Sequence, residues 1–130
     1  MARATLLILS AAAGLAATVL APTAAAGTAS RYAAALQCPS HFTSRHEPVL
    51  LVHGTGLTAA ESWSWNYAKA LPARGYDVCT VQLPGYAMGD IQTSAAYVRY
   101  AVERIAVESG RNVDVITHSQ GGMEARWAVK

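Results

Sequence analysis

The chain contains one stretch that decides its fold, at residues 113–122. It reads Val113-Asp114-Val115-Ile116-Thr117-His118-Ser119-Gln120-Gly121-Gly122. A short segment rich in β-branched residues, typical of a strand, leads into a tight Thr-x-Ser-x-Gly turn, and residues 123–130 have the apolar spacing of a helix. Strand, sharp turn and helix form the setting of a nucleophile elbow, usually written Gly-x-Ser-x-Gly, with Thr117 at the place of the first glycine. The alternative is an ordinary strand-to-helix loop, because a five-residue match is weak by itself.

Two further strands are predicted upstream of this stretch. The apolar run 48–52 suits a central parallel strand buried on both faces, and residues 77–83 form a second strand closed by Pro84 and Gly85. Helical spacing fills the intervals: one helix follows the Thr58-x-x-Glu61 capping box and ends at Pro72 and Gly75, and a longer one follows Asp90. Strands that alternate with helices predict an α/β fold with a parallel sheet and flanking helices.

The amino terminus has the pattern of a secretory signal peptide. A basic start is followed by an uncharged, alanine-rich segment that ends in small residues around Ala24 and Ala26. We expect cleavage after Ala26; an uncleaved membrane anchor is the alternative, although the segment is weakly apolar for a span. This divides the chain into a signal peptide (1–26), an amino-terminal arm (27–47) and an α/β domain (48–130), and predicts an extracellular protein.

The two cysteines, Cys38 and Cys79, follow the predicted signal peptide. An even number of cysteines in an exported protein suggests a disulfide, and two buried free thiols are the alternative. The net charge of +2, from scattered basic residues, gives no indication of nucleic-acid binding.

The loop His53-Gly54-Thr55-Gly56 follows the first predicted strand. Glycines allow such a loop to aim a backbone N–H at a developing oxyanion. The same residues, with Ala59, also match a dinucleotide-binding fingerprint that has an acidic residue, Asp77, at a suitable distance. However, Asp77 opens the second strand, whereas a ribose-binding acid belongs at the far end of that strand. The oxyanion loop is therefore favoured.

A serine nucleophile needs a general base, and the four histidines are the candidates. His118 adjoins Ser119, and the elbow should point the two side chains apart. His53 lies in the oxyanion loop, where packing of the turn is its expected role. His41 and His46 precede the first strand, opposite to the Ser…Asp/Glu…His order of α/β-hydrolases. No histidine follows Ser119 in the sequence, so the triad is incomplete in this chain.

Together these motifs resemble the secreted lipases of the α/β-hydrolase superfamily, over about residues 38–130. The matching blocks are residues 48–56, Gly75-Tyr76-Asp77-Val78-Cys79, and Thr117-His118-Ser119-Gln120-Gly121-Gly122. In that family threonine replaces the first elbow glycine, and a disulfide lies where Cys38 and Cys79 stand.

The resemblance implies roles for individual residues. Ser119 is implied as the nucleophile, with Thr55 and Gln120 supplying the oxyanion hole. His118 lies where a fungal member of the family has a tryptophan that lines the alcohol side of the pocket. Because the residue differs, the resemblance does not imply the same stereoselectivity for this chain. The family's catalytic aspartate and histidine come well after the elbow.

The sequence therefore predicts the amino-terminal part of a secreted serine lipase or carboxylesterase that acts through an acyl-enzyme. Its substrate would be a small-molecule or lipid ester, with transient contact to a lipid interface, and neither a metal nor an organic cofactor is implied. Two alternatives stay open: a thioesterase or acyltransferase on the same scaffold, and a non-catalytic secreted module. Because the chain reaches Lys130 inside a helix without a capping residue, we expect it to be a fragment that is inactive alone and leaves its nucleophile strand at the sheet edge.

Overall fold

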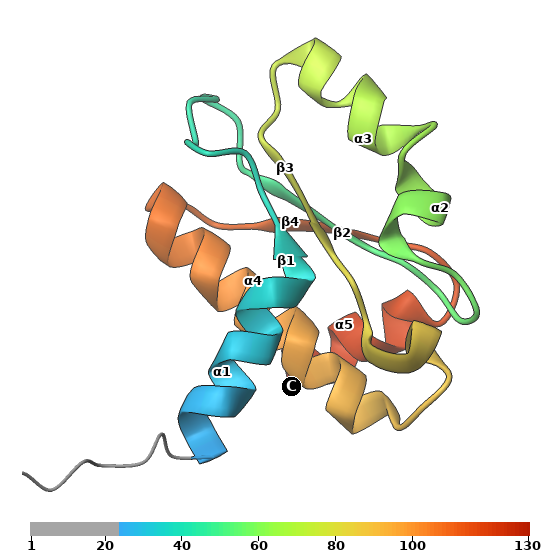
Figure 1. Cartoon of the computed structure of the whole chain (residues 1–130). Coiled ribbons are helices and arrows are strands. Elements are labelled where there is room, and N and C mark those ends of the chain that lie inside the picture. The colour runs from blue at the N-terminus through green and yellow to red at the C-terminus, as the bar shows by residue number, and fades with distance from the viewer. Residues whose placement is uncertain (1–23) are drawn as a thin grey trace, which may run out of the picture.

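A computed structural model describes residues 24–130 of the chain. The elements are α1 (Ala24–Ala35), β1 (Leu36–Gln37), β2 (Val49–Val52), α2 (Ala59–Trp63), α3 (Tyr67–Ala70), η1 (Pro72–Arg74), β3 (Val78–Val81), η2 (Pro84–Ala87), α4 (Ile91–Ser109), β4 (Asp114–Thr117) and α5 (Gly121–Ala128). The predicted alternation of strands and helices is confirmed (Figure 1).

The four strands form one sheet in the order β1-β3-β2-β4. β2 pairs in parallel with both β3 and β4, whereas β1 runs antiparallel to β3. The sheet is therefore mixed rather than wholly parallel, because the arm adds a short strand that the sequence did not reveal. Within the described residues, β4, the strand that leads into the nucleophile turn, lies at the sheet edge.

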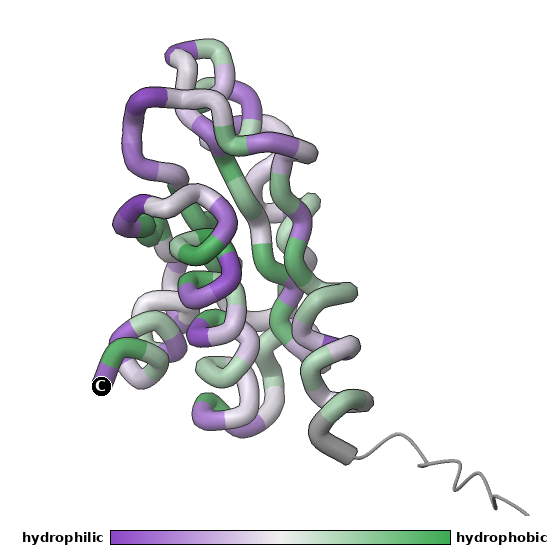
Figure 2. The backbone as a smooth tube through the Cα atoms, turned by 90° about the vertical axis from the view of Figure 1, so that its left-hand side faces the viewer, coloured by the Kyte–Doolittle hydropathy of each residue, from purple (hydrophilic) through white to green (hydrophobic). Residues whose placement is uncertain are grey.

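Helices cover both faces of the sheet. On one face Leu50 and Val52 pack with residues of α4, among them Val98 and Ile105. On the other face Val49 and Leu51 pack with α2 and the segment after it. Successive side chains of a strand point to opposite faces, and both faces are covered here, so all four residues of β2 are buried. Figure 2 shows this core as the predominantly green strands, between helices in which green and purple segments alternate.

Local sequence signals explain most helix ends. Thr58 and Glu61 form the predicted capping box, Asp90 caps α4, and Gly110 ends α4 with a left-handed backbone. The single helix expected after the capping box is instead interrupted between α2 and α3. Asn66 causes the break: its side chain accepts a hydrogen bond from the Tyr67 N–H and donates to the Ser62 carbonyl, so it competes with the helical pattern.

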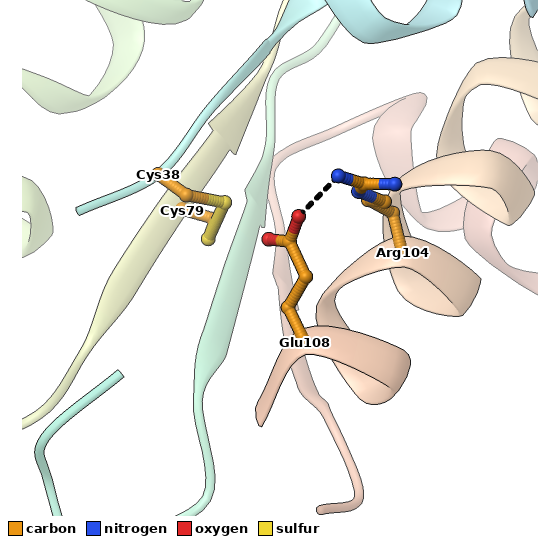
Figure 3. The surroundings of a disulfide bond; sticks show 4 residues. All are labelled: Cys38, Cys79, Arg104 and Glu108. Carbon is orange, nitrogen blue, oxygen red and sulfur yellow. Dashed lines mark ion pairs between the residues drawn. A yellow bond between two sulfur atoms is a disulfide. The ribbon is translucent and has the colours of Figure 1, made fainter. Parts of the chain in front are cut away.

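The predicted disulfide between Cys38 and Cys79 is present, and it ties the arm to β3 (Figure 3). Arg104 and Glu108 of α4 lie beside it and form an ion pair of 2.6 Å. Most of the expected signal peptide lies outside the described residues, and α1 spans the expected cleavage point after Ala26. None of the described helices is long and apolar enough to cross a membrane.

Candidate active site

The turn between β4 and α5 has the backbone of a nucleophile elbow. Ser119 has a φ of +54°, a left-handed conformation that non-glycine residues rarely adopt. Hydrogen bonds from Gly121 N–H to the His118 carbonyl and from Gly122 N–H to the Ser119 carbonyl close the turn, at 3.0 and 3.1 Å. The Ser119 residue is exposed. A strained, exposed serine at the carboxyl end of a parallel strand is suited to nucleophilic attack.

Two glycines allow this turn to sit tightly against the end of β2. A Cβ on Gly121 would lie 2.6 Å from the His53 carbonyl oxygen and 2.8 Å from that of Val52. A Cβ on Gly54 would lie 2.9 Å from the Ser119 Cβ. These distances are too short for a side chain, so both glycines are needed for the close approach of the oxyanion loop to the elbow.

The structure brings Thr55 and Gln120 together beside Ser119, although they are distant in sequence. The Thr55 hydroxyl donates a hydrogen bond to Gln120 Oε1 at 2.5 Å. Among the described residues, no hydrogen bond uses the backbone N–H of Thr55 or of Gln120. Two unused N–H donors that flank a serine can stabilise an oxyanion formed on attack.

The Gln120 side chain is held by two further acceptors. Its Nε2 donates to the Ala87 carbonyl at 2.9 Å and to Glu124 Oε1 at 2.8 Å. Glu124 is fully buried in α5, and sequence reasoning missed it. Part of the signal was available, because the four-residue spacing places Gln120 and Glu124 on one face of the predicted helix, but the burial of Glu124 was not.

His53 is buried at the carboxyl end of β2 and has a structural role. Its Nε2 accepts the Leu83 N–H at 2.9 Å, and its Nδ1 lies 2.9 Å from the Gly54 carbonyl, so this nitrogen carries the proton. Burial lowers the pKa of His53 below its ordinary value. A neutral imidazole with both nitrogens engaged packs the turn, as expected, and cannot serve Ser119 as a base.

The other histidines do not supply a base in the described structure. The ring of His46 stacks on Tyr76 at the amino end of the sheet, with centroids 4.3 Å apart. His118 is exposed and lines a pocket of about 370 Å³ together with aromatic residues that include Trp63 and Trp65. Among residues 24–130, no hydrogen bond joins an imidazole to the Ser119 side chain.

The alternative of a dinucleotide site finds no geometric support. Asp77 lies before β3, at the opposite end of the sheet from the 53–56 loop. Its Oδ2 accepts the Ser44 N–H at 2.8 Å and lies 3.6 Å from Arg111 Nη2. In the part of the chain that the structure describes, no three His, Cys, Asp or Glu side chains are grouped to hold a metal ion.

Comparisons with known proteins agree with this geometry. The sequence matches the alpha/beta hydrolase family over residues 49–128. It is 34% identical over 88 residues to lipase B of Pseudozyma antarctica. This alignment covers 67% of this chain and 26% of that protein.

Solved structures show the same likeness. Lipase B of Aspergillus fumigatus matches with a TM-score of 0.69 and 34% identity, over 75% of this chain and 24% of that one. Bacillus licheniformis lipase BlEst2 in its mature form matches with a TM-score of 0.61 and 22% identity, over 72% of this chain and 39% of that one. At this identity the match supports a shared fold only. The chain spans about a quarter of the length of the two lipases B.

Proposed function

The chain belongs to the alpha/beta hydrolase family, and on this premise we propose that it carries the nucleophile and oxyanion hole of a secreted serine lipase or carboxylesterase. One observation carries the proposal. Ser119, with its left-handed backbone, stands between β4 and α5 beside the unused N–H groups of Thr55 and Gln120. The lipases to which the chain is similar support an ester as the substrate class.

The proposed reaction begins with attack of Ser119 Oγ on the ester carbonyl carbon. The Thr55 and Gln120 N–H groups stabilise the negative charge that develops on the carbonyl oxygen. The alcohol leaves, and water then hydrolyses the acyl-enzyme and regenerates the serine. The pocket that His118 lines adjoins the elbow and would receive part of the ester.

The proton of Ser119 needs an acceptor, which residues 24–130 do not provide. We therefore propose that the 130-residue chain alone gives no measurable turnover of p-nitrophenyl butyrate. The family order places the acid and base of the triad after the elbow. Expression from the complete reading frame, which includes any residues encoded beyond Lys130, should then give activity. Turnover by the 130-residue chain that Ser119→Ala abolishes would reveal a base within it.

The nucleophile is tested by labelling in the protein expressed from its complete reading frame. A fluorophosphonate probe should label Ser119, and Ser119→Ala should abolish the labelling. Ser40→Ala changes an exposed serine of the amino-terminal arm and should leave the labelling intact. Labelling that persists in Ser119→Ala would overturn the assignment, and a panel of esters and thioesters would define the acyl substrate.

Secretion is part of the same proposal. The disulfide between Cys38 and Cys79 supports an extracellular location, because disulfides persist in oxidising compartments. If the signal peptide is cleaved after Ala26, amino-terminal sequencing of material recovered from the medium should begin at Gly27. An intact Met1 in a membrane fraction would contradict cleavage.

A further inference from the structure

The buried side chain of Glu124 is not used in the reaction proposed above. The residue lies in α5, one helical turn after Gln120, and has no exposed surface. Its Oε1 accepts the Gln120 Nε2–H at 2.8 Å, and its Oε2 is buried without a hydrogen-bond partner among the described residues. Burial of a half-satisfied carboxyl group costs free energy that an apolar residue of similar size would avoid. A role outside simple packing would explain its presence.

Glu124 determines which way the Gln120 amide faces. The amide nitrogen meets two acceptors, Glu124 Oε1 and the Ala87 carbonyl oxygen. A reversed amide would place its own oxygen against both of them, so Gln120 Oε1 must face the other way. It therefore faces Thr55, and the Thr55 hydroxyl must be the donor in the 2.5 Å hydrogen bond between them.

This hydrogen bond links the two halves of the proposed oxyanion hole. Thr55 belongs to the loop after β2 and Gln120 to the start of α5, and their side chains are in direct contact. On these grounds we propose that Glu124 is a positioning residue: through the Gln120 amide it fixes Thr55 against the elbow and sets the separation of the two N–H donors. The inference rests on the proposed function of Ser119.

A strained turn after β3 contacts both the loop after β2 and Gln120. Tyr86 and Ala87 have φ values of +57° and +55°, and such strain persists only where the surroundings impose it. The Tyr86 carbonyl accepts the Gly56 N–H at 2.7 Å, and the Ala87 carbonyl accepts the Gln120 amide. The turn thus contacts both sides of the oxyanion hole, and Glu124 holds Gln120 in place against it.

The expected kinetic effect falls on kcat. Removal of one oxyanion donor typically lowers kcat by about 10²–10³, so displacement of donors that remain present should cost less, about 10–10². The interaction strengthens in the transition state rather than in the bound ester, so KM should change less than about threefold. A purely structural role would instead lower the amount of folded protein and leave kcat per active site unchanged.

The experiment uses the protein expressed from its complete reading frame, with Glu124→Ala, Glu124→Gln and Val98→Ala. Glutamine keeps an oxygen that can accept the Gln120 N–H, whereas alanine removes it. Val98→Ala destabilises the core packed on α4 and removes no hydrogen-bonding group of this network. Turnover of p-nitrophenyl butyrate is normalised to active sites by fluorophosphonate titration, and side-chain amide NMR signals report on Gln120 directly.

We expect Glu124→Ala to lower kcat about 10–10²-fold and to move the Gln120 amide signals toward those of a free glutamine. Glu124→Gln should retain at least about a third of kcat and keep the signals, and Val98→Ala should alter neither. Unchanged Gln120 signals in Glu124→Ala would overturn the inference. If the unsubstituted protein shows no Ser119-dependent turnover, the proposed function fails, and the NMR comparison still decides whether Glu124 positions Gln120.

Discussion

The two ends of the parallel strands are built in opposite ways. At the amino end, the groups around Asp77 satisfy one another: Asp77 accepts the Ser44 N–H, and Arg111 donates to the carbonyls of Ser44 and His46. At the carboxyl end, two backbone N–H groups beside Ser119 are unused. Among the described residues, all non-glycine residues with positive φ lie at this end, in the turn after β3 and at Ser119.

The difference separates stability from chemistry within one small sheet. Hydrogen bonds and the disulfide hold the arm against the amino end, so this end can impose a fixed strand register. The carboxyl end can then keep strained residues, each of which costs about 1–3 kcal/mol, beside the two unused N–H donors. Substitutions at the two ends should therefore have different effects on stability and on the reactivity of Ser119.

The largest effect is expected where the arm is anchored. Cys79→Ser removes the bond to Cys38 and frees the arm that carries Ser44 and His46. We expect the free energy of unfolding to fall by roughly 2–5 kcal/mol, as for other disulfides of small secreted domains. Denaturant unfolding of the oxidised protein and the variant measures this. A reduced unsubstituted protein is the matched control and should approach the variant; equal stability of all three would contradict the anchoring role.

The carboxyl end is tested by a single methyl group at the elbow. Gly121→Ala places a Cβ against the carbonyl oxygens of His53 and Val52, which are backbone atoms and cannot turn aside. We expect a loss of about 1–3 kcal/mol from overpacking, together with reduced fluorophosphonate labelling, because the elbow must move away from the oxyanion loop.

The neighbouring glycine supplies the control for this variant. A Cβ on Gly122 would meet only the Thr117 hydroxyl oxygen, at 3.4 Å, within the first turn of α5. Alanine is favoured over glycine in helices by up to about 1 kcal/mol, so Gly122→Ala should be neutral or slightly stabilising. If both alanine variants behaved alike, close packing at Gly121 would not be what shapes the elbow.

The contrast between the two ends also explains what the sequence could predict. Buried strands and caps depend on neighbours in sequence, so β2, the Thr58 capping box and the Asp90 cap were predictable. The pairing of β1 with β3, the burial of Glu124 and the hydrogen bond from Gln120 to the Ala87 carbonyl depend on tertiary packing. The helix break at Asn66 was partly predictable. Asparagine competes for backbone hydrogen bonds, but the apolar spacing on either side favoured a continuous helix. Ser119, Thr55 and Gln120 could be named from the sequence because the elbow and the loop after β2 are local motifs, whereas Glu124 was missed because its burial depends on the fold.

The smallest effect is expected from pH, through the one histidine buried at the carboxyl end. Burial lowers the pKa of folded His53 below the ordinary value of 6.5 that it should have in the unfolded chain. Above that value His53 is neutral in both states, and its contribution to stability is fully present. As pH falls below about 6.5, the unfolded chain binds a proton that the folded protein does not, so the free energy of unfolding decreases until the folded pKa is passed.

His53→Gln removes this titration and should give a shallower decline of stability between about pH 6.5 and 5. The variant should also be less stable at neutral pH, because the hydrogen bonds to Leu83 and Gly54 are perturbed. Denaturant unfolding of both proteins across this range tests the prediction. Parallel declines in the two proteins would show that protonation of His53 does not contribute to the pH dependence of stability.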